Sequence, residues 1–336
     1  MQVDENSQHL MEDEKNGLIG KLGILALLAV GLLMFPPLSI LAPVPFAFAI
    51  LVTGRIKGLF FGGIFSVGMT ILAIYFPDFI NPLAKGSLFF AITGLFLAEV
   101  VLRKIHPIRG FITLGILLNI LFGAILLIGI SSKNFSPKKV VEESVVKLVT
   151  EFKASDKLNS LKEEEGEEAR AIKDIIDNPQ NLVKKIVSWI PAGIFVSTFF
   201  FVWICSYVIL RNSLFWRQKV KYPFGIKDFL RFKVPDYFVY PLILSLVLTL
   251  GGEYVLGEQG TLIGGNLLYC LGIFYFFHGL GIFVDLLDYL KVFGLLRTLM
   301  FAITFLFAWR VLVIAGVFDL WVNFRKFFNK SNISKK

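Results

Sequence analysis

The last hydrophobic block of the chain, residues 263–326, reads IGGNLLYCLGIFYFFHGLGIFVDLLDYLKVFGLLRTLMFAITFLFAWRVLVIAGVFDLWVNFRK. Two apolar runs in it are long enough to cross a bilayer as helices, which takes about 20 residues each. Polar residues interrupt both runs, and an ionisable group at membrane depth needs a partner or a function because lipid does not solvate it. These residues are Asn266, His278, Asp285, Asp288, Arg297, Arg310 and Asp319. The block therefore indicates a membrane-spanning protein with polar groups among its helices.

The composition of the whole chain points the same way. Hydrophobic residues make up 56% of it, and Lys, Arg, Asp and Glu together only 18%, which excludes an ordinary soluble domain. The net charge of +9 comes from Lys and Arg beside apolar runs, so the positive-inside rule explains it and nucleic acid is not an expected partner. Cys205 and Cys270 both lie in apolar runs, so neither a disulfide framework nor a cysteine metal site is expected.

The apolar runs predict an all-α, polytopic transmembrane helix bundle of about nine spans, with eight or ten as alternatives. The runs cover residues 17–35, 38–54, 58–76, 86–102, 111–130, 188–210, 238–250, the stretch after 263, and 294–318. The predicted parts are a disordered acidic tail (1–16), a five-helix membrane half (17–130), an amphipathic helical insert (131–187), a second membrane half (188–328) and a basic tail (329–336).

The insert carries the pattern of a small helical cap. Ser136-Pro137 is a favourable helix start, and apolar residues follow it on one helical face. Those residues are Val141, Val145, Leu148, Val149 and Phe152. A second amphipathic helix is expected around 169–176, and Asn178-Pro179 suits the start of the next span. The insert holds no phosphate-binding loop, catalytic carboxylate pair or metal-ligand spacing.

The loop at 211–235 is the strongest marker of topology. It holds seven Lys or Arg before Pro235, interleaved with aromatic residues, and we expect it to lie on an anionic cytoplasmic membrane face. Its aromatic residues are Phe215, Trp216, Tyr222, Phe224, Phe229 and Phe232. The positive-inside rule then puts the N-terminus in the cytoplasm, and the insert and a flexible Gly-rich loop at 251–262 outside.

The C-terminus conflicts with this scheme. Nine spans would place it outside, although residues 325–336 are strongly basic. Either one segment is re-entrant, or the run Gly294–Phe318 is broken near Arg310. Asp319, close to Trp321, has the pattern of an interfacial anchor.

Several residues in the first half are candidates for packing or for a site. Pro43 and Pro45 interrupt the second span, which predicts a kinked helix inside the bundle or the wall of a cavity. Glu99 lies four residues before Arg103, which favours an interfacial ion pair over a proton site. Asn119 stands in mid-span, where an interhelical hydrogen bond is usual. The Gly58 and Gly62 spacing predicts close helix packing, within the chain or in a homo-oligomer.

The charged residues of the last block suggest pairing. His278 and Asp285 are seven residues apart, on nearly the same helix face, and Asp288 follows one turn later. Either aspartate is expected to pair with Arg297 or Arg310. Such pairs form a charge relay for protons or anions, or they fix the register of the last helices.

Several landmarks in order resemble the YybS-like family of uncharacterised bacterial multi-pass membrane proteins. They are the Pro-interrupted second span, WIPAGIF, FLRFKVPDYFVYPLI, NLLYCLGIFYFFHGLGIFVDLL and AGVFDLWVNFRK. The resemblance implies a bacterial cytoplasmic (inner) membrane location. That family is distantly similar to the substrate-binding subunits of energy-coupling-factor transporters, although the Ala-x-x-x-Ala docking face of those subunits is missing from the first span here.

These observations predict a transporter-like or small-ligand-binding bundle. The candidate cavity residues are Pro43, Pro45, Asn119, Asn266, His278, Asp285, Asp288 and Arg310. The alternative is a non-catalytic scaffold that recruits partners through the insert and the basic loop. No enzyme motif is present, so neither catalysis nor a cofactor or metal is expected. Expected partners are lipid, with anionic lipid at the basic loop, and a second copy or another membrane protein.

Overall fold

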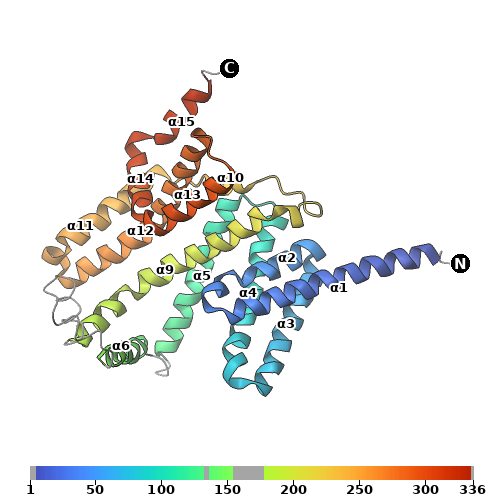
Figure 1. Cartoon of the computed structure of the whole chain (residues 1–336). Helices are drawn as coiled ribbons and strands as arrows, with labels where there is room; N and C mark the ends of the chain where they lie inside the picture. Colours follow the sequence, from blue (N-terminus) through green and yellow to red (C-terminus); the bar gives the residue numbers. More distant parts are fainter. Residues whose placement is uncertain (1–4, 132–135, 154–177, 334–336) are drawn as a thin grey trace. The chain divides into compact units, whose positions relative to one another are not determined.

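The computed structural model describes residues 5–131, 136–153 and 178–333, and all regular secondary structure in these ranges is helical (Figure 1). The predicted all-α bundle is therefore confirmed. The helices form two compact units. Unit 1 comprises Met1–Ile116, Phe199–Lys233 and Phe276–Lys336, and unit 2 comprises Leu117–Thr198 and Val234–Tyr275. Three long helices contribute residues to both units: α5 (Pro107–Ser131), α9 (Pro179–Arg211) and α12 (Glu258–Tyr289).

The N-terminal helices of unit 1 pack around α2. The elements are α1 (Glu5–Met34), the 3₁₀ turn η1 (Pro36–Leu41), α2 (Pro43–Thr53), α3 (Arg55–Tyr75) and α4 (Pro77–Leu102). Helix α2 is buried along most of its length and contacts α1, α3 and α4. The second span lies inside the bundle, as predicted, and its prolines stand where the 3₁₀ turn η1 changes to α-helix, because Pro43 and Pro45 both lie in the first turn of α2. Proline is tolerated there, since the first N–H groups of a helix have no intrahelical acceptor.

Small residues allow these helices to approach closely. A Cβ at Gly58 would overlap the backbone of Ile50 in α2, and one at Gly94 in α4 would overlap the carbonyl oxygen of Pro43. Gly62 faces Ala91 of α4 and Phe46 of α2. The predicted packing role of Gly58 and Gly62 is thus fulfilled within the chain.

An aromatic cluster forms the core of the rest of unit 1. Phe111 of α5 lies at its centre, with edge-on contacts to rings from α9, from α12 and from two positions of the basic loop. The surrounding rings are Phe199, Phe229, Phe232 and Phe277. The basic loop contributes η2 (Ser213–Phe215) and α10 (Ile226–Leu230), and the C-terminal part contributes α13 (Gly294–Phe307), α14 (Trp309–Val322) and α15 (Phe324–Ile333).

The run from 294 to 322 is not one straight helix. Helices α13 and α14 meet at Ala308 with a bend of 92°. This confirms that the last apolar run is broken, with the break two residues before Arg310. Each half has 14 residues, about 21 Å of helix, which is shorter than the hydrocarbon core of a bilayer.

Unit 2 contains a tight helical hairpin. Helix α11 (Val239–Leu256) follows η3 (Asp236–Phe238) and reverses into α12 at Gly257, whose φ of 65° is accessible to glycine. Gly252 lies against the backbone of Gly260, and Gly264 against that of Thr249. The flexible loop predicted at 251–262 is therefore wrong, because its glycines let the two helix backbones meet.

Unit 2 also holds the described part of the insert. Helix α6 (Pro137–Lys153) begins where Ser136-Pro137 predicted, and Lys139 N–H lies 3.5 Å from Ser136 Oγ. Helix α9 begins at Pro179, as predicted. The second amphipathic helix, expected around 169–176, lies outside the described residues.

The two tails are helical where they are described. Helix α1 begins at Glu5, so the predicted disorder of residues 1–16 is wrong for 5–16, which extend the first span as helix. At the other end, α15 runs to Ile333. Residues 1–4 and 334–336 lie outside the described residues.

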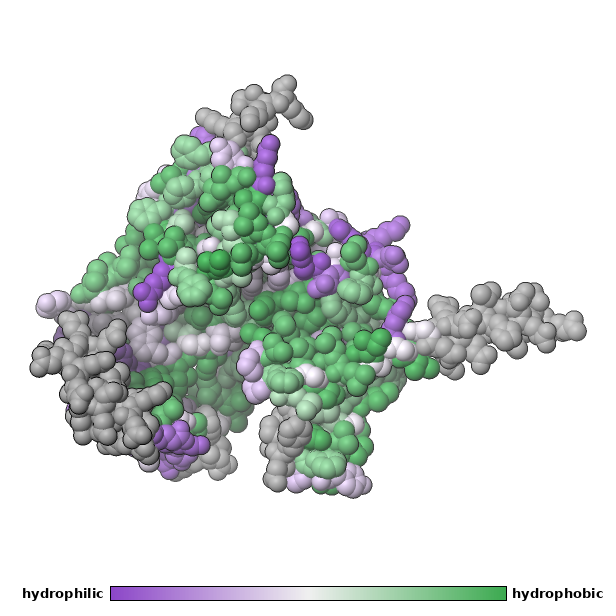
Figure 2. Space-filling model, viewed as in Figure 1, coloured by the Kyte–Doolittle hydropathy of each residue, from purple (hydrophilic) through white to green (hydrophobic). Residues whose placement is uncertain are grey.

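Seven helices of the described chain are long and apolar enough to cross a membrane, or eight if the bent pair α13–α14 counts as one span. The remaining predicted span, the fourth, lies in α4, whose apolar stretch Gly86–Leu102 is too short to be counted with them. Many large apolar side chains are exposed, among them Leu250, Leu295 and Phe307, each more than 80% accessible. Figure 2 shows hydrophobic residues over most of the visible face. Such a surface needs lipid around it.

Candidate functional site

His278 and Asp319 form a buried pair inside unit 1. The Nε2 atom of His278, on α12, lies 3.0 Å from Oδ2 of Asp319, on α14. The two residues are 1% and 7% exposed. The other carboxylate oxygen of Asp319 accepts the N–H of Phe324, just after the left-handed Asn323 that ends α14. The prediction that Asp319 is an interfacial anchor is wrong, because both of its oxygens have partners inside the protein.

Arg325 extends this pair along α12. Its Nη2 atom donates to the carbonyl oxygen of Phe232 at 2.7 Å, and its Nε lies 3.5 Å from Oδ2 of Asp285. A side chain at position 281 would overlap the guanidinium, so Gly281 leaves the space that Arg325 occupies. Burial lowers the pKa of the Arg325 guanidinium, while Asp285 and Asp319 act in the opposite direction.

Two aspartates near the end of α12 bind the basic loop and α13. Asp285 accepts from Arg231 Nε at 2.8 Å, and Asp288 pairs with Lys227 at 3.3 Å. Asp288 also pairs with Arg297, as one of the alternatives predicted. We name the eight side chains of this region the charge network. Its members are Lys227, Arg231, His278, Asp285, Asp288, Arg297, Asp319 and Arg325.

Arg310 does not join the charge network. It is exposed, and its guanidinium lies 5.4 Å from the ring centroid of Trp309. Among the described residues it has no ion-pair partner, so of the two arginines predicted to pair with the aspartates, Arg297 is the one that does. The bend at Ala308 turns α14 away from the direction of α13, and helical spacing from Arg297 therefore does not locate Arg310.

Sequence reasoning missed Lys227, Arg231 and Arg325 as partners of the α12 aspartates. Lys227 and Arg231 belong to the loop predicted on the membrane face, and Arg325 belongs to the basic C-terminal segment. Helical spacing identifies neighbours on one helix only. Arg231 and Asp285 are 54 positions apart and Lys227 and Asp288 are 61 apart, so helical spacing does not predict these contacts. Charge balance is the one signal available, since acids near a helix end opposite a basic loop favour pairing.

A second candidate site is a groove within unit 2, which we name the asparagine groove. It has a volume of about 620 Å³ and is lined by α5, α6, α9 and α12. Asn119 and Asn266 line it together with Cys270, and none of the described lining residues is charged. The remaining lining is aliphatic or aromatic, with Phe195 and Leu267 as examples. The structure thus brings two of the predicted cavity residues to one site.

Asn266 also repairs the backbone of α9 beside Pro191. Its Oδ1 accepts the N–H of Ala192 at 3.1 Å, and its Nδ2 donates to Ser188 O at 2.9 Å. In a regular helix, the groups at 192 and 188 would bond to each other. The amide of Asn266 replaces that bond where proline interrupts the helix, as helices require in lipid. Asn266 therefore holds α9 and α12 together at the wall of the asparagine groove.

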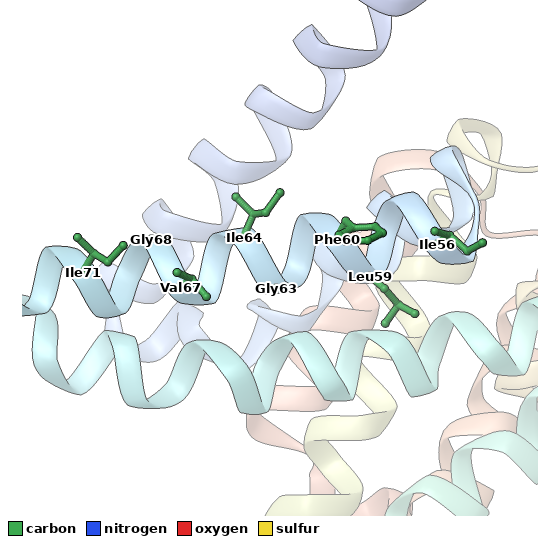
Figure 3. A pocket seen from close by; sticks show the side chains of 8 residues that line it. All are labelled: Ile56, Leu59, Phe60, Gly63, Ile64, Val67, Gly68 and Ile71. Carbon is green, nitrogen blue, oxygen red and sulfur yellow. The ribbon is translucent and has the colours of Figure 1, made fainter.

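A larger groove runs along α3 and has a different character (Figure 3). Its volume is about 700 Å³, and its lining consists of apolar side chains and glycines. The lining residues are Ile56, Leu59, Phe60, Gly63, Ile64, Val67, Gly68 and Ile71. No polar group of this lining can orient a ligand. We interpret the α3 groove as surface in contact with lipid chains.

The aromatic residues of the basic loop are part of the protein core. Trp216 donates to Ile209 O at 3.1 Å, and Tyr222 donates to Ile105 O at 2.8 Å. Phe229 and Phe232 pack on Phe111. The prediction that these four residues lie on the membrane face is wrong, because burial in the aromatic cluster competes successfully with lipid. Among the loop aromatics, Phe215 is the strongly exposed exception, at 73%.

Glu99 forms the predicted ion pair and has a second partner. It accepts from Arg103 at 2.7 Å and also pairs with Arg55, at the start of α3. Both arginines are more than half exposed, so the carboxylate joins two basic turns at the surface. No group of three or more His, Cys, Asp or Glu in the described ranges could hold a metal ion.

Comparison with known proteins now adds a family. A family model described as a predicted membrane protein (DUF2232) matches residues 23–320. The chain belongs to this DUF2232 family. The DUF2232 match includes both His278 and Asp319 and ends before Arg325. No match to a curated protein or to a solved structure was found. Membership in DUF2232 agrees with the expected multi-pass membrane protein. The resemblance to YybS-like proteins and to energy-coupling-factor subunits remains a prediction.

Proposed function

We propose that this protein is a transporter-like helix bundle that binds a small, uncharged amphiphile in the asparagine groove. The observation that carries the proposal is the composition of this groove: a largely apolar lining with Asn119 and Asn266 and without a charge among the described lining residues. A few polar groups in a mostly apolar cavity are typical of small-molecule sites, and the volume lies within their usual range.

The chemistry of the lining selects the ligand class. A charged headgroup would lose its hydration in the groove without gaining an ion pair. An amide or hydroxyl group, in contrast, can donate a hydrogen bond to Oδ1 of Asn266, which accepts one bond from Ala192 and has a second lone pair. The apolar wall from α5 and α9 fits an aliphatic chain or ring. The ligand is therefore a neutral molecule that partitions into the bilayer.

Blocking the groove tests the proposal. Gly123 lines the groove and has open space where a Cβ would stand, so Gly123→Phe fills it without a backbone clash. Gly193 on α9 also faces open space and is exposed, but it does not line the groove, so Gly193→Phe is the matched control. The detergent-purified proteins are titrated with monooleoylglycerol, a neutral single-chain probe, and the melting temperature is followed.

We expect the probe to stabilise the wild type and Gly193→Phe, and to have little effect on Gly123→Phe. At about 100 times Kd, one bound ligand stabilises a protein by about 2.7 kcal/mol. Equal responses of all three proteins, or no response of the wild type, would overturn the proposal. Protection of the groove thiol Cys270 from N-ethylmaleimide gives a second readout, which does not depend on stability.

The membrane orientation belongs to this proposal. Unit 1 contains the basic turns at 55–57 and 103–109 and the basic loop at 211–233. The positive-inside rule places these turns in the cytoplasm of a bacterial cell, together with the N-terminus. The insert and the hairpin turn at Gly257, both in unit 2, then face the outside.

The scaffold function is a second candidate, and α6 provides its support. Val146 and Leu148 of α6 are 46% and 65% exposed, whereas Val145 is buried. Exposed apolar residues on a helix outside the membrane can be covered by a partner protein. Val146→Ser with Leu148→Ser would abolish co-purification of such a partner and leave the response to monooleoylglycerol unchanged. Retention of every co-purifying protein would exclude this candidate.

A further inference from the structure

The charges and contacts of the last three helices of unit 1 determine on which side of the membrane the chain ends. Helix α13 runs antiparallel to α12: Arg297 pairs with Asp288, and further along Phe305 packs on Phe276. Phe301 contacts Phe283 between these two points. Helix α13 therefore starts at the C-terminal end of α12 and leads back along it.

Helix α14 does not continue in this direction. After the 92° bend, the backbone of Leu312 lies against Gly279, and seven residues later Asp319 reaches His278. Helix α14 thus crosses α12 near one level, about 15 Å from the end of α12 at Tyr289. A helix that crosses its neighbour in this way does not complete a span.

Helix α15 then returns to the end of α12. Arg325 contacts Asp285 and the carbonyl oxygen of Phe232 in the basic loop. One turn later, Phe328 packs on Tyr289, the last residue of α12. Helices α13–α15 therefore start beside the C-terminal end of α12, turn at the level of Gly279 and return to the same end of α12.

Helix α15 and the basic loop present similar side chains at this end. Lys326 and Phe327 of α15 are exposed. In the loop, exposed Leu214 and Phe215 lie in sequence between the exposed Arg211 and Arg217. Basic residues next to exposed apolar residues at the end of a span fit the interface of an anionic leaflet.

We propose that α13–α15 form a re-entrant hairpin, and that α15 joins the basic loop in one surface that binds anionic lipid headgroups. An acidic protein partner would also meet the positive charge, but it would leave Leu214, Phe215 and Phe327 without apolar contacts. An anionic lipid leaflet meets the positive charge with its headgroups and the exposed apolar side chains with its acyl chains. The proposal does not depend on a ligand in the asparagine groove.

The side of the C-terminus is tested by labelling single cysteines. In a background of Cys205→Ser and Cys270→Ser, we introduce Leu214→Cys in the loop, Phe327→Cys in α15 and Tyr254→Cys near the α11–α12 turn. An impermeant maleimide is applied to cells and to inverted vesicles. We expect positions 214 and 327 to react from the same side and position 254 from the opposite side. Reaction of 327 together with 254 would overturn the proposal.

Lipid binding is tested on the same Phe327→Cys protein, labelled with an environment-sensitive fluorophore. In phosphatidylcholine vesicles, added phosphatidylglycerol should shift the emission to the blue, and salt should reverse the shift by screening. Lys326→Gln should weaken the apparent affinity for phosphatidylglycerol about fivefold, as expected for one basic residue at an anionic surface. The control Lys139→Gln removes one exposed charge from α6 and should change nothing. No shift, or equal effects of both variants, would overturn the proposed surface.

Discussion

His278 and Asp319 meet across 41 residues of sequence, with 3.0 Å between Nε2 and Oδ2, and neither side chain reaches the surface. The pair joins α12, a full-length span, to α14, which is too short to cross alone. The pair thereby fixes the position of α14 against α12, which the helix propensity of the sequence does not determine. The carboxylate also ends α14 by accepting the N–H of Phe324. One aspartate thus sets both the crossing point of α14 and the return of the chain.

Removal of one partner of this pair should destabilise the protein strongly. In His278→Leu the carboxylate of Asp319 stays buried with one hydrogen-bond partner fewer, and a buried polar group that loses its partner costs about 1–3 kcal/mol. In Asp319→Leu the imidazole of His278 loses its partner. The double variant should lose less than the sum of the two single variants. Unfolding in mixed micelles measures all three free energies.

Arg310→Gln is the control for this cycle. Its guanidinium is exposed beside Trp309, so the variant should stay within about 0.5 kcal/mol of the wild type, as is usual for surface positions. Additive effects of His278→Leu and Asp319→Leu would show that the two side chains do not interact.

Two glycines of α12 give a test of the hairpin contact. A side chain at Gly279 would overlap the carbonyl oxygen of Leu312, whereas one at Gly272 would meet open space. Gly279→Val should therefore push α14 away and destabilise the protein by about 1–3 kcal/mol, as overpacking does. Gly272→Val should be near neutral. Thermal unfolding in detergent measures both, and similar melting temperatures would contradict the close contact.

The sequence predicted the elements of this fold better than their contacts. Apolar runs of about 20 residues identify spans because lipid forbids unpaired backbone. Ser136-Pro137 and Asn178-Pro179 marked helix starts correctly because Ser and Asn suit the N-cap and Pro suits the first helical position. Intrahelical pairing of Glu99 with Arg103 was also predicted, since spacing along one helix is fixed by its geometry.

The partners from distant segments were not predictable in this way. Arg231 reaches Asp285 because the basic loop folds onto α12 through buried Phe229 and Phe232, and Arg325 reaches it from α15. Aromatic residues between basic ones are compatible with a lipid surface and with a protein core alike. The tertiary packing decides between these two environments, and a single sequence does not show which residues will be neighbours in the fold.

Replacement of Asn266 should weaken α9 at its proline. Asn266→Leu leaves the N–H of Ala192 and the carbonyl of Ser188 without their partners, which should cost about 1–3 kcal/mol for each buried group left unpaired. Adding Pro191→Ala restores a helix in which positions 188 and 192 can bond to each other. The double variant should thus be more stable than Asn266→Leu alone. Equal stabilities, measured by unfolding in micelles, would contradict the repair role.

Glu99 should contribute little to stability. The carboxylate joins Arg55 and Arg103, but both arginines are largely exposed, and surface ion pairs are typically worth about 0–1 kcal/mol. Glu99→Gln should therefore unfold within about 1 kcal/mol of the wild type. The difference should shrink at high ionic strength because salt screens exposed charges. A larger loss that salt does not reduce would indicate a role for Glu99 beyond the ion pair.

Tyr222 should make the protein sensitive to alkaline pH. Burial, assisted by the nearby charge of Asp228, raises the pKa of Tyr222 well above its usual value of about 10. The folded protein therefore holds the phenol proton more tightly than the unfolded chain does. The resulting stability is present below the unfolded pKa of about 10 and is lost as the pH rises toward the folded pKa.

Tyr222→Phe removes the hydrogen bond to Ile105 O and should cost about 1 kcal/mol at neutral pH. Above pH 10 the wild type should lose stability faster than Tyr222→Phe, so that the two unfolding free energies converge. Tyr254→Phe, at a position 93% exposed, is the control and should follow the wild type at every pH. A constant difference between wild type and Tyr222→Phe up to the highest pH would contradict the raised pKa.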